Sequence, residues 1–306
     1  MQHHLLPTQI DLRALSPLAP SAQDLADFVR GADDVTLESV STIWCLLPIV
    51  DGELQEEKLR TLLDLLTALD HNVDLVRDVM DLAQRERFAP KFRIFRRMYP
   101  RVFHVGMLRG IGQLLGAYLG LRDRGIGRRY DALADLPAHT FGHQLWQFYV
   151  QNEMKPAGRF GAYPYEQIGP HDAHHVLAGC DTSYEGEFLV LPFECGSSKC
   201  LTADFLVTMM LQAHVGMSLD PSVPPTRGLF DPEMFFSEFA RGARVREDLL
   251  AQNWDFWAQV DRPIADVRAH LGIDAGGNVD SDHPQWNGKD SPKNLALLES
   301  SPRPAG

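Results

Sequence analysis

Two histidines and two carboxylates of this chain have a spacing that suits one divalent metal ion. His171, Asp172 and His175 are followed by Glu187, so that all four lie within 17 residues. In a helix, His171 and His175 lie one turn apart on one face, and Asp172 leans toward the same side. Imidazole and carboxylate suit tetrahedral zinc, and equally a non-haem iron that keeps a position open. The alternative is a polar helix end with surface histidines; the second histidine and Glu187 favour the metal.

The local sequence predicts a short helix, a tight loop and a second helix around these residues. Pro170 marks the start of the first helix, because proline is tolerated at the first helical position. Gly179 ends this helix after about two turns. Thr182 and Glu185 form a capping box for the second helix, which places Glu187 in its first turn.

The pattern His-Asp-x-x-His-x11-Glu resembles the signature of the ubiquinone (coenzyme Q) biosynthesis protein 4 family. A second family glutamate, seven residues on, is Glu194 here. The resemblance covers roughly residues 95–273 and includes the flanking segments 136–143 and 239–273. The chain departs from the family at Ala173 and His174, where the family has an aromatic residue or leucine, and at Pro192. It looks like a divergent, bacterial-type member.

This resemblance implies a multi-helix, all-α domain that acts late in ubiquinone assembly. The implied step is oxidative decarboxylation at carbon one of a polyprenylated benzoate-type ring. The implied metal ligands are His171, Asp172, His175 and Glu187, with zinc expected and iron as the alternative. Glu194 would orient a ligand histidine or move a proton. The expected partners are a polyprenylated quinone precursor, other ubiquinone-biosynthesis proteins and further copies of this chain.

Three further histidines have less specific positions. His174 points to another part of its helix and is predicted to be a bystander. His139 and His143 form a second i, i+4 pair, which we interpret as core or second-shell histidines; a metal pair on the helix face is the alternative.

Two other functions fit parts of the pattern. An HD-type metal phosphohydrolase is also helical and uses a His-Asp pair, with His143 and either Asp204 or Asp220 completing its site; it needs neither His175 nor Glu187. A lipid-binding scaffold that organises other ubiquinone enzymes would hold the metal for a structural purpose.

The chain has 306 residues and 44% apolar content, enough for one large or two modest domains. Residues 1–20 are predicted to be irregular and residues 274–306 to be a disordered tail. Between them we predict a small helical unit over residues 21–90 and the family-like domain over 91–273. Ser21 is the candidate first cap, and leucines 59–69 supply the apolar stripe of the best helix in the small unit.

The turn at Asp51, Glu53 and Glu57 resembles, weakly, the acidic turn of tellurite-resistance TerB-like domains. These oxygens would suit a hard cation. The plainer interpretation is a turn followed by acids at a helix N-terminus, where the macrodipole favours them.

Glycines recur every fourth residue, at Gly112, Gly116 and Gly120, in the apolar stretch 105–121. In a helix they would form a groove for an isoprenoid chain or for a closely packed helix. The stretch is interrupted by Arg109 and Gln113, so no membrane span is predicted.

The net charge of −12 argues against nucleic-acid binding. Residues 85–129 nevertheless hold twelve Lys or Arg and two acids, giving +10 there and −22 elsewhere. This basic segment predicts either peripheral binding to an anionic membrane surface or arginines paired with the acidic N-terminal region. Four cysteines without a signal-like start predict a reducing compartment. We therefore expect a cytoplasmic protein that associates peripherally with the inner membrane.

Overall fold

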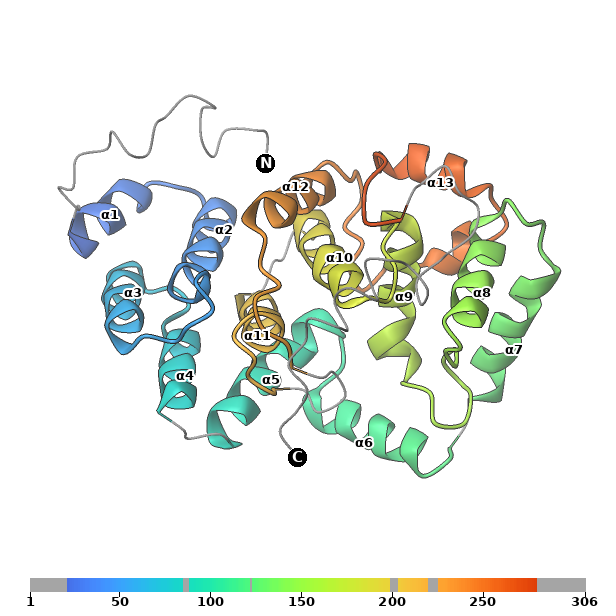
Figure 1. The fold of residues 1–306 in the computed structure, drawn as a ribbon, viewed down its shortest axis with the longest axis horizontal. Helices are drawn as coiled ribbons and strands as arrows, with labels where there is room; N and C mark the ends of the chain where they lie inside the picture. Colours follow the sequence, from blue (N-terminus) through green and yellow to red (C-terminus); the bar gives the residue numbers. More distant parts are fainter. Residues whose placement is uncertain (1–20, 85–87, 122, 199–202, 220–224, 280–306) are drawn as a thin grey trace. The chain divides into compact units, whose positions relative to one another are not determined.

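The chain is helical throughout the ranges that the computed structural model describes, which are residues 21–84, 88–121, 123–198, 203–219 and 225–279. Within these ranges thirteen α-helices are joined by loops and short 3₁₀ turns, and there is no strand or sheet (Figure 1). The all-α prediction is therefore confirmed. None of the helices in these ranges has both the length and the apolar character that a bilayer crossing needs.

The chain divides into two compact units. The described residues within 1–97 and 199–230 form unit 1, and those within 98–198 and 231–306 form unit 2. Helix α5 (Phe88–Val102) runs through the division between them. This division differs from the predicted boundary after residue 90, because a segment from within the predicted family-like domain returns to the N-terminal unit.

Unit 1 is built mainly from short helices. Its remaining elements are α1 (Ala22–Val29), α2 (Asp34–Trp44), η2 (Leu47–Ile49), α3 (Glu56–Leu69), α4 (Val73–Ala83) and α11 (Ala203–Ala213). The cap predicted at Ser21 is present, since its hydroxyl accepts the Asp24 N–H and its own N–H donates to the Asp24 carboxylate. Five leucines of α3 are buried, as the stripe predicted.

A buried ion pair connects α11 to the rest of unit 1. Asp204, at the start of α11, accepts a hydrogen bond from Arg97 Nε at 2.8 Å, and Arg97 also reaches Asp78 at 2.7 Å. Arg93 binds both Asp78 and Asp81. Asp78 and Asp204 are almost fully buried, where a carboxylate needs such partners. Two arginines of the basic segment are thus paired with acids of unit 1.

The acidic turn of unit 1 has the plainer of its two predicted arrangements. Asp51 accepts hydrogen bonds from Lys58 Nζ and from the Glu53 N–H, and this lysine lowers the pKa of Asp51. Glu57 lies in the first turn of α3. Among the described residues these acids do not gather as a set of metal ligands.

Unit 2 carries the predicted metal residues. Its elements are α6 (Met107–Tyr118), α7 (Arg124–Ala132), η3 (Leu133–Asp135), α8 (Phe141–Gln151), α9 (Tyr165–Ala178), α10 (Tyr184–Ser197), α12 (Pro232–Ala243), η4 (Phe256–Gln259) and α13 (Ile264–Leu271). Helix α9 packs between α8 and α10, and α10 packs extensively against α12 (Figure 1).

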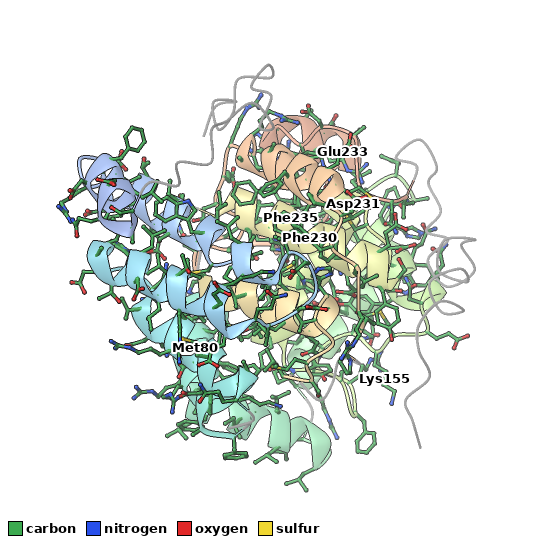
Figure 2. All side chains as sticks on the ribbon, turned by 60° about the vertical axis from the view of Figure 1, so that its left-hand side comes forward. Met80, Lys155, Phe230, Asp231, Glu233 and Phe235 are labelled. Atoms are coloured by element: carbon green, nitrogen blue, oxygen red, sulfur yellow. The ribbon has the colours of Figure 1, made fainter. Side chains whose placement is uncertain are left out.

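Helices α10 and α12 touch backbone to backbone. A Cβ atom added at Gly242 would lie 2.0 Å from the carbonyl oxygen of Phe193, and one at Gly196 would lie 2.1 Å from that of Phe239. At the other end of the contact, Phe235 of α12 packs on Phe188 with ring centroids 5.8 Å apart. Figure 2 labels Phe235 on α12. Glycine at both crossing points therefore fixes the position of α10.

The predicted glycine groove on α6 does not form as one surface. Gly112 faces open space, whereas a side chain of Leu121 lies 3.1 Å from the Cβ position of Gly116. Gly120 has a φ of +89° in the turn after the helix, beside Phe160. What α6 presents instead is a stripe of exposed apolar side chains at helical spacing, formed by Leu108, Ile111, Leu115 and Leu119.

The C-terminal segment is ordered further than predicted. Residues 274–279 are described and hydrogen-bonded, because Arg241 donates to the Asp274 carbonyl and the Val279 N–H donates to the Gly179 carbonyl. The remainder of the predicted tail and the predicted irregular start, residues 280–306 and 1–20, lie outside the described residues.

Candidate metal centre

The site residues are carried by α9 and α10 and by the loop between them. Helix α9 begins at Tyr165, five residues earlier than predicted, with Pro170 inside it. Pro170 is the sixth residue of the helix, past the first four N–H groups that lack helical partners, so its ring removes one backbone hydrogen bond from the helix interior. Gly179 ends the helix as predicted, with a φ of +72°.

The second helix begins one residue later than predicted. Ser183, not Thr182, caps α10 by accepting the Gly186 N–H at 3.0 Å. The hydroxyl of Thr182 instead donates to the Asn152 side chain. Glu187 lies in the first turn of α10, as predicted.

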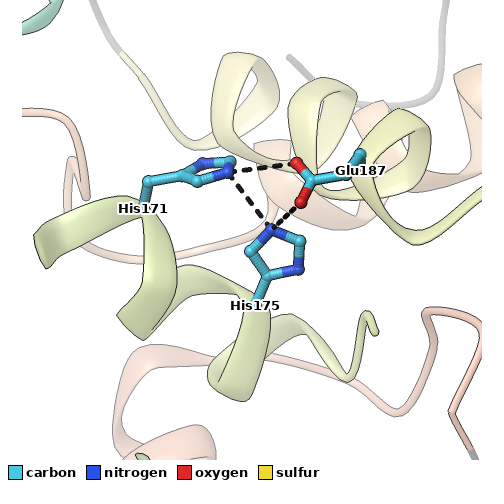
Figure 3. Close-up of side chains that lie close together, drawn as sticks. All are labelled: His171, His175 and Glu187. Carbon is cyan, nitrogen blue, oxygen red and sulfur yellow. Dashed lines mark hydrogen bonds and ion pairs between the residues drawn. The ribbon is translucent and has the colours of Figure 1, made fainter. Parts of the chain in front are cut away.

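His171, His175 and Glu187 come together as a set of three potential ligands (Figure 3). The two Nε2 atoms lie 3.1 Å apart. The Glu187 carboxylate lies 3.3 Å from Nε2 of His171 and 3.4 Å from Nε2 of His175, one oxygen facing each ring. Ligands bound to zinc at 2.0–2.1 Å in a tetrahedron are about 3.3 Å from one another. The three groups therefore already have the spacing of one face of such a tetrahedron.

The Nδ1 atom of each ring makes a hydrogen bond, and this leaves the Nε2 atom available to bind a metal. Nδ1 of His175 lies 3.2 Å from the Cys180 carbonyl, which can only accept, so this nitrogen carries the proton. Nδ1 of His171 lies 2.9 Å from the Glu194 carboxylate and donates to it. In the neutral rings the Nε2 lone pairs are left free, and such outer partners also fix ring orientation.

Glu194 lies on the predicted face despite Pro192. Its carboxylate is 2% exposed and accepts hydrogen bonds from His171 and also from Nδ1 of His174 at 2.6 Å. Burial alone would raise the pKa of Glu194, but the charge of His171 and these hydrogen bonds outweigh it and lower the pKa to about 2. His174 is therefore not a bystander. It is fully buried, and its ring stands 5.0 Å from that of Trp254.

The field of the two glutamates favours a positive charge at the centre. Burial alone would lower the pKa of His171, but Glu194 and Glu187 outweigh it and hold the pKa well above its usual value. Burial alone would raise the pKa of Glu187, but His175 and His171 outweigh it and hold the pKa well below its usual range. A divalent cation in place of the proton would satisfy the same groups.

Asp172 lies beside the three ligands and not among them. Its carboxylate accepts the hydroxyl of Tyr149, a side chain of α8 that the sequence did not single out. Burial raises the pKa of Asp172 to about 6, and His171, Tyr149 and His175 limit the rise. The position fits an outer carboxylate that can hold or accept a proton.

The centre is reachable from solvent on one side. The Glu187 side chain is 40% exposed and that of His171 23%, whereas His175 is 1% exposed. Three protein ligands with an accessible side leave room for a further ligand, as in catalytic zinc sites and in two-histidine, one-carboxylate iron sites.

The other histidines have different surroundings. His139 is exposed, contrary to the predicted core or second-shell position. His143 is half-buried and packs on Trp146, with ring centroids 5.1 Å apart. Cys45, Cys180 and Cys195 are free, buried thiols, and Cys200 lies outside the described residues.

Two features that complete the site carry no signal in the sequence. The Cys180 group that binds His175 is a backbone carbonyl, and Tyr149 comes from a different helix.

In comparisons with known proteins, no family model and no curated protein matches the chain. The chemistry of the centre therefore rests on the residues themselves.

Proposed function

We propose that this chain is a metal-dependent enzyme of ubiquinone biosynthesis that removes the carboxyl group from carbon one of a polyprenylated benzoate-type ring and places a hydroxyl there. The observation that carries the proposal is the spacing of the His171 and His175 Nε2 atoms and the Glu187 carboxylate. The resemblance of the His-Asp-x-x-His-x11-Glu pattern supplies the substrate class.

The proposed reaction breaks the bond between the ring and its carboxyl group, which leaves as carbon dioxide. One atom of dioxygen forms the new carbon–oxygen bond, and the other leaves as water with two protons and an external two-electron donor. A bound divalent metal would anchor the substrate's oxygens, and a redox-active one would also engage dioxygen. Zinc, the metal we expect from the ligand types, would supply only the first of these; the oxidative step would need a redox-active metal, for which iron is the candidate.

The chain's own residues have distinct parts in this scheme. Glu194 holds the His171 ring, so we regard it as a positioning residue. Asp172 and Tyr149 form a buried acid–phenol pair beside the ligands, suited to hold a proton near the ring carboxyl.

The proposal predicts release of labelled carbon dioxide from a short-chain prenylated hydroxybenzoate labelled in its carboxyl group. The iron-loaded protein, given dioxygen and a reductant, should release it, and Glu187→Ala should not. Glu185→Ala, on the same helical turn, is the matched control. Equal release from Glu187→Ala and from the wild type would refute the catalytic role of the centre.

A second candidate is a lipid-binding scaffold in which the metal is structural. The exposed stripe of α6 favours it, since Leu108 and Leu119 are each 80% exposed and Leu115 is 57% exposed. A row of this kind usually marks an interaction surface. Arg109 lies on the same helix, and Arg124 and Arg128 lie on α7; all three are exposed.

We predict that this stripe binds anionic vesicles peripherally. Each exposed arginine contributes about 1 kcal/mol near such a surface, less as salt screens it. The fraction of protein that sediments with the vesicles should therefore fall at high salt. It should also fall in the triple variant Arg109→Gln/Arg124→Gln/Arg128→Gln and in the double variant Leu108→Ser/Leu115→Ser. The matched control is Phe28→Ser/Val150→Ser, which removes two exposed apolar side chains outside the stripe. Vesicle binding that is equal in all of these proteins would place the lipid contact elsewhere.

A further inference from the structure

Residues 274–279, here called the C-terminal strap, pass over the loop that joins the two ligand-bearing helices. The Val279 N–H donates to the Gly179 carbonyl at 3.0 Å. The backbones approach so closely that a Cβ at Gly277 would lie 2.0 Å from the Gly179 oxygen. Conversely, a Cβ at Gly179 would lie 2.7 Å from the Gly276 oxygen. Both sides of this contact therefore require glycine.

Asn278 connects the strap to the loop through its side chain. Its Oδ1 accepts the Asp181 N–H at 2.9 Å, and its Nδ2 donates to the Asp181 carboxylate at 2.7 Å and to the Ser183 hydroxyl at 3.2 Å. All the polar atoms of this amide thus bind residues 181–183. Ser183 is the cap of α10, and the Asp181 carboxylate accepts both the N–H and the hydroxyl of Ser183.

The loop under the strap holds groups that determine the metal centre. The Cys180 carbonyl, adjacent to Asp181, accepts the Nδ1–H of His175. Glu187 lies one turn after the Ser183 cap. The amide of Asn278 therefore binds next to the group that orients one ligand and at the start of the helix that carries another.

The strap itself is anchored to a buried ion pair. Arg241 donates to the Asp274 carbonyl at 3.1 Å and to the Ala178 carbonyl at 2.7 Å, at the end of α9. The Glu238 carboxylate binds Arg241 and accepts the Gly277 N–H at 3.2 Å. These contacts hold the strap and the end of α9 to the same two side chains of α12.

We infer that the strap is part of the metal centre, and that Asn278 is a positioning residue that keeps His175 and Glu187 at ligand spacing. The inference rests on the proposed metal site and extends it to a segment outside the family-like pattern. Loss of outer-shell partners typically weakens metal binding by about 10- to 100-fold. Asn278 binds residues next to such partners and not the ligands themselves, so we expect the lower end of this range, about tenfold, for the loss of its amide.

The test is a competition titration of the full-length protein with zinc or cobalt(II) against a chromophoric chelator. Asn278→Ala should bind about tenfold more weakly than the wild type and should show an altered cobalt visible spectrum. Asn253→Ala, the same substitution at an exposed position of unit 2, should match the wild type in both. The titration is made well below the unfolding temperature, so that a loss of stability alone leaves the affinity and spectrum unchanged.

The possible results distinguish the role of the strap from the metal site on which that role rests. Wild-type affinity and spectrum in Asn278→Ala, even with a lower melting temperature, would overturn the role of the strap and leave the metal site intact. A wild-type protein that binds neither ion would overturn the metal site itself. Should Asn278→Ala fail to fold, Asn278→Ser, which keeps one polar group in place of the amide, is expected to show a smaller loss of affinity; unchanged affinity in that variant would also overturn the inference.

Discussion

Replacing Gly242 by alanine is expected to destabilise unit 2 by about 2 kcal/mol. The added methyl group would overlap the Phe193 carbonyl oxygen at 2.0 Å, and the neighbouring contact at Gly196 prevents α10 and α12 from sliding apart without losing their packing. Overpacking of this kind costs roughly 3 kcal/mol, and the better helix propensity of alanine returns at most about 1 kcal/mol. Chemical denaturation, followed by circular dichroism, measures the difference.

Gly112→Ala is the matched control for this substitution. Gly112 also lies within a helix, but a Cβ there meets no atom within 4 Å. It should therefore gain about 0.5–1 kcal/mol from helix propensity alone. Equal effects of the two substitutions would mean that the glycine contact between α10 and α12 does not limit their approach.

The sequence predicts the core of the site because its signals are local. The i, i+4 spacing of His171 and His175 fixes their common face once the helix forms, and Gly179 marks the end of that helix. Glu187 lies in the first turn of the next helix, and this position places its carboxylate opposite the two histidines. Residue spacing and helix-ending signals of this kind depend on few distant contacts.

The errors at the helix starts come from competing local signals. Pro170 suits a first helical position, yet the helix begins at Tyr165, whose ring packs against Gly169 where a Cβ would come within 2.6 Å. Thr182 and Ser183 are both good caps, and the hydrogen bonds of Ser183 with Asp181 and Asn278 favour the second. In both cases packing with other residues selects between starts that the sequence leaves nearly equal.

Roles that depend on distant partners are not visible in the sequence. Asp172 has the spacing of a ligand, but Tyr149 of α8 binds its carboxylate. Likewise, Arg93 and Arg97 belong to a basic segment, but buried aspartates of unit 1 bind them. One of these pairs, between Arg97 and Asp204, links α11 to the rest of unit 1 across 107 residues of sequence.

Removing either His175 or Glu187 should abolish tight metal binding, which is the largest effect we expect at the site. Each is one of three ligands, so its loss leaves two, and the glutamate field that favours a cation is also weakened when Glu187 is removed. Asp172→Asn should retain the metal, because its amide oxygen can still accept the Tyr149 hydroxyl and the three ligands remain. His139→Ala, which removes an exposed imidazole, is the matched control for His175→Ala.

The most direct measurement is the metal content of the wild type and these variants, purified without chelators and analysed by elemental mass spectrometry. The proposed centre predicts one divalent ion per chain in the wild type, in Asp172→Asn and in His139→Ala, and an ion content near zero in His175→Ala and Glu187→Ala. Circular dichroism of each variant shows whether it is folded. Folded His175→Ala and Glu187→Ala proteins with the metal content of the wild type would contradict the assignment of His171, His175 and Glu187 as the metal ligands.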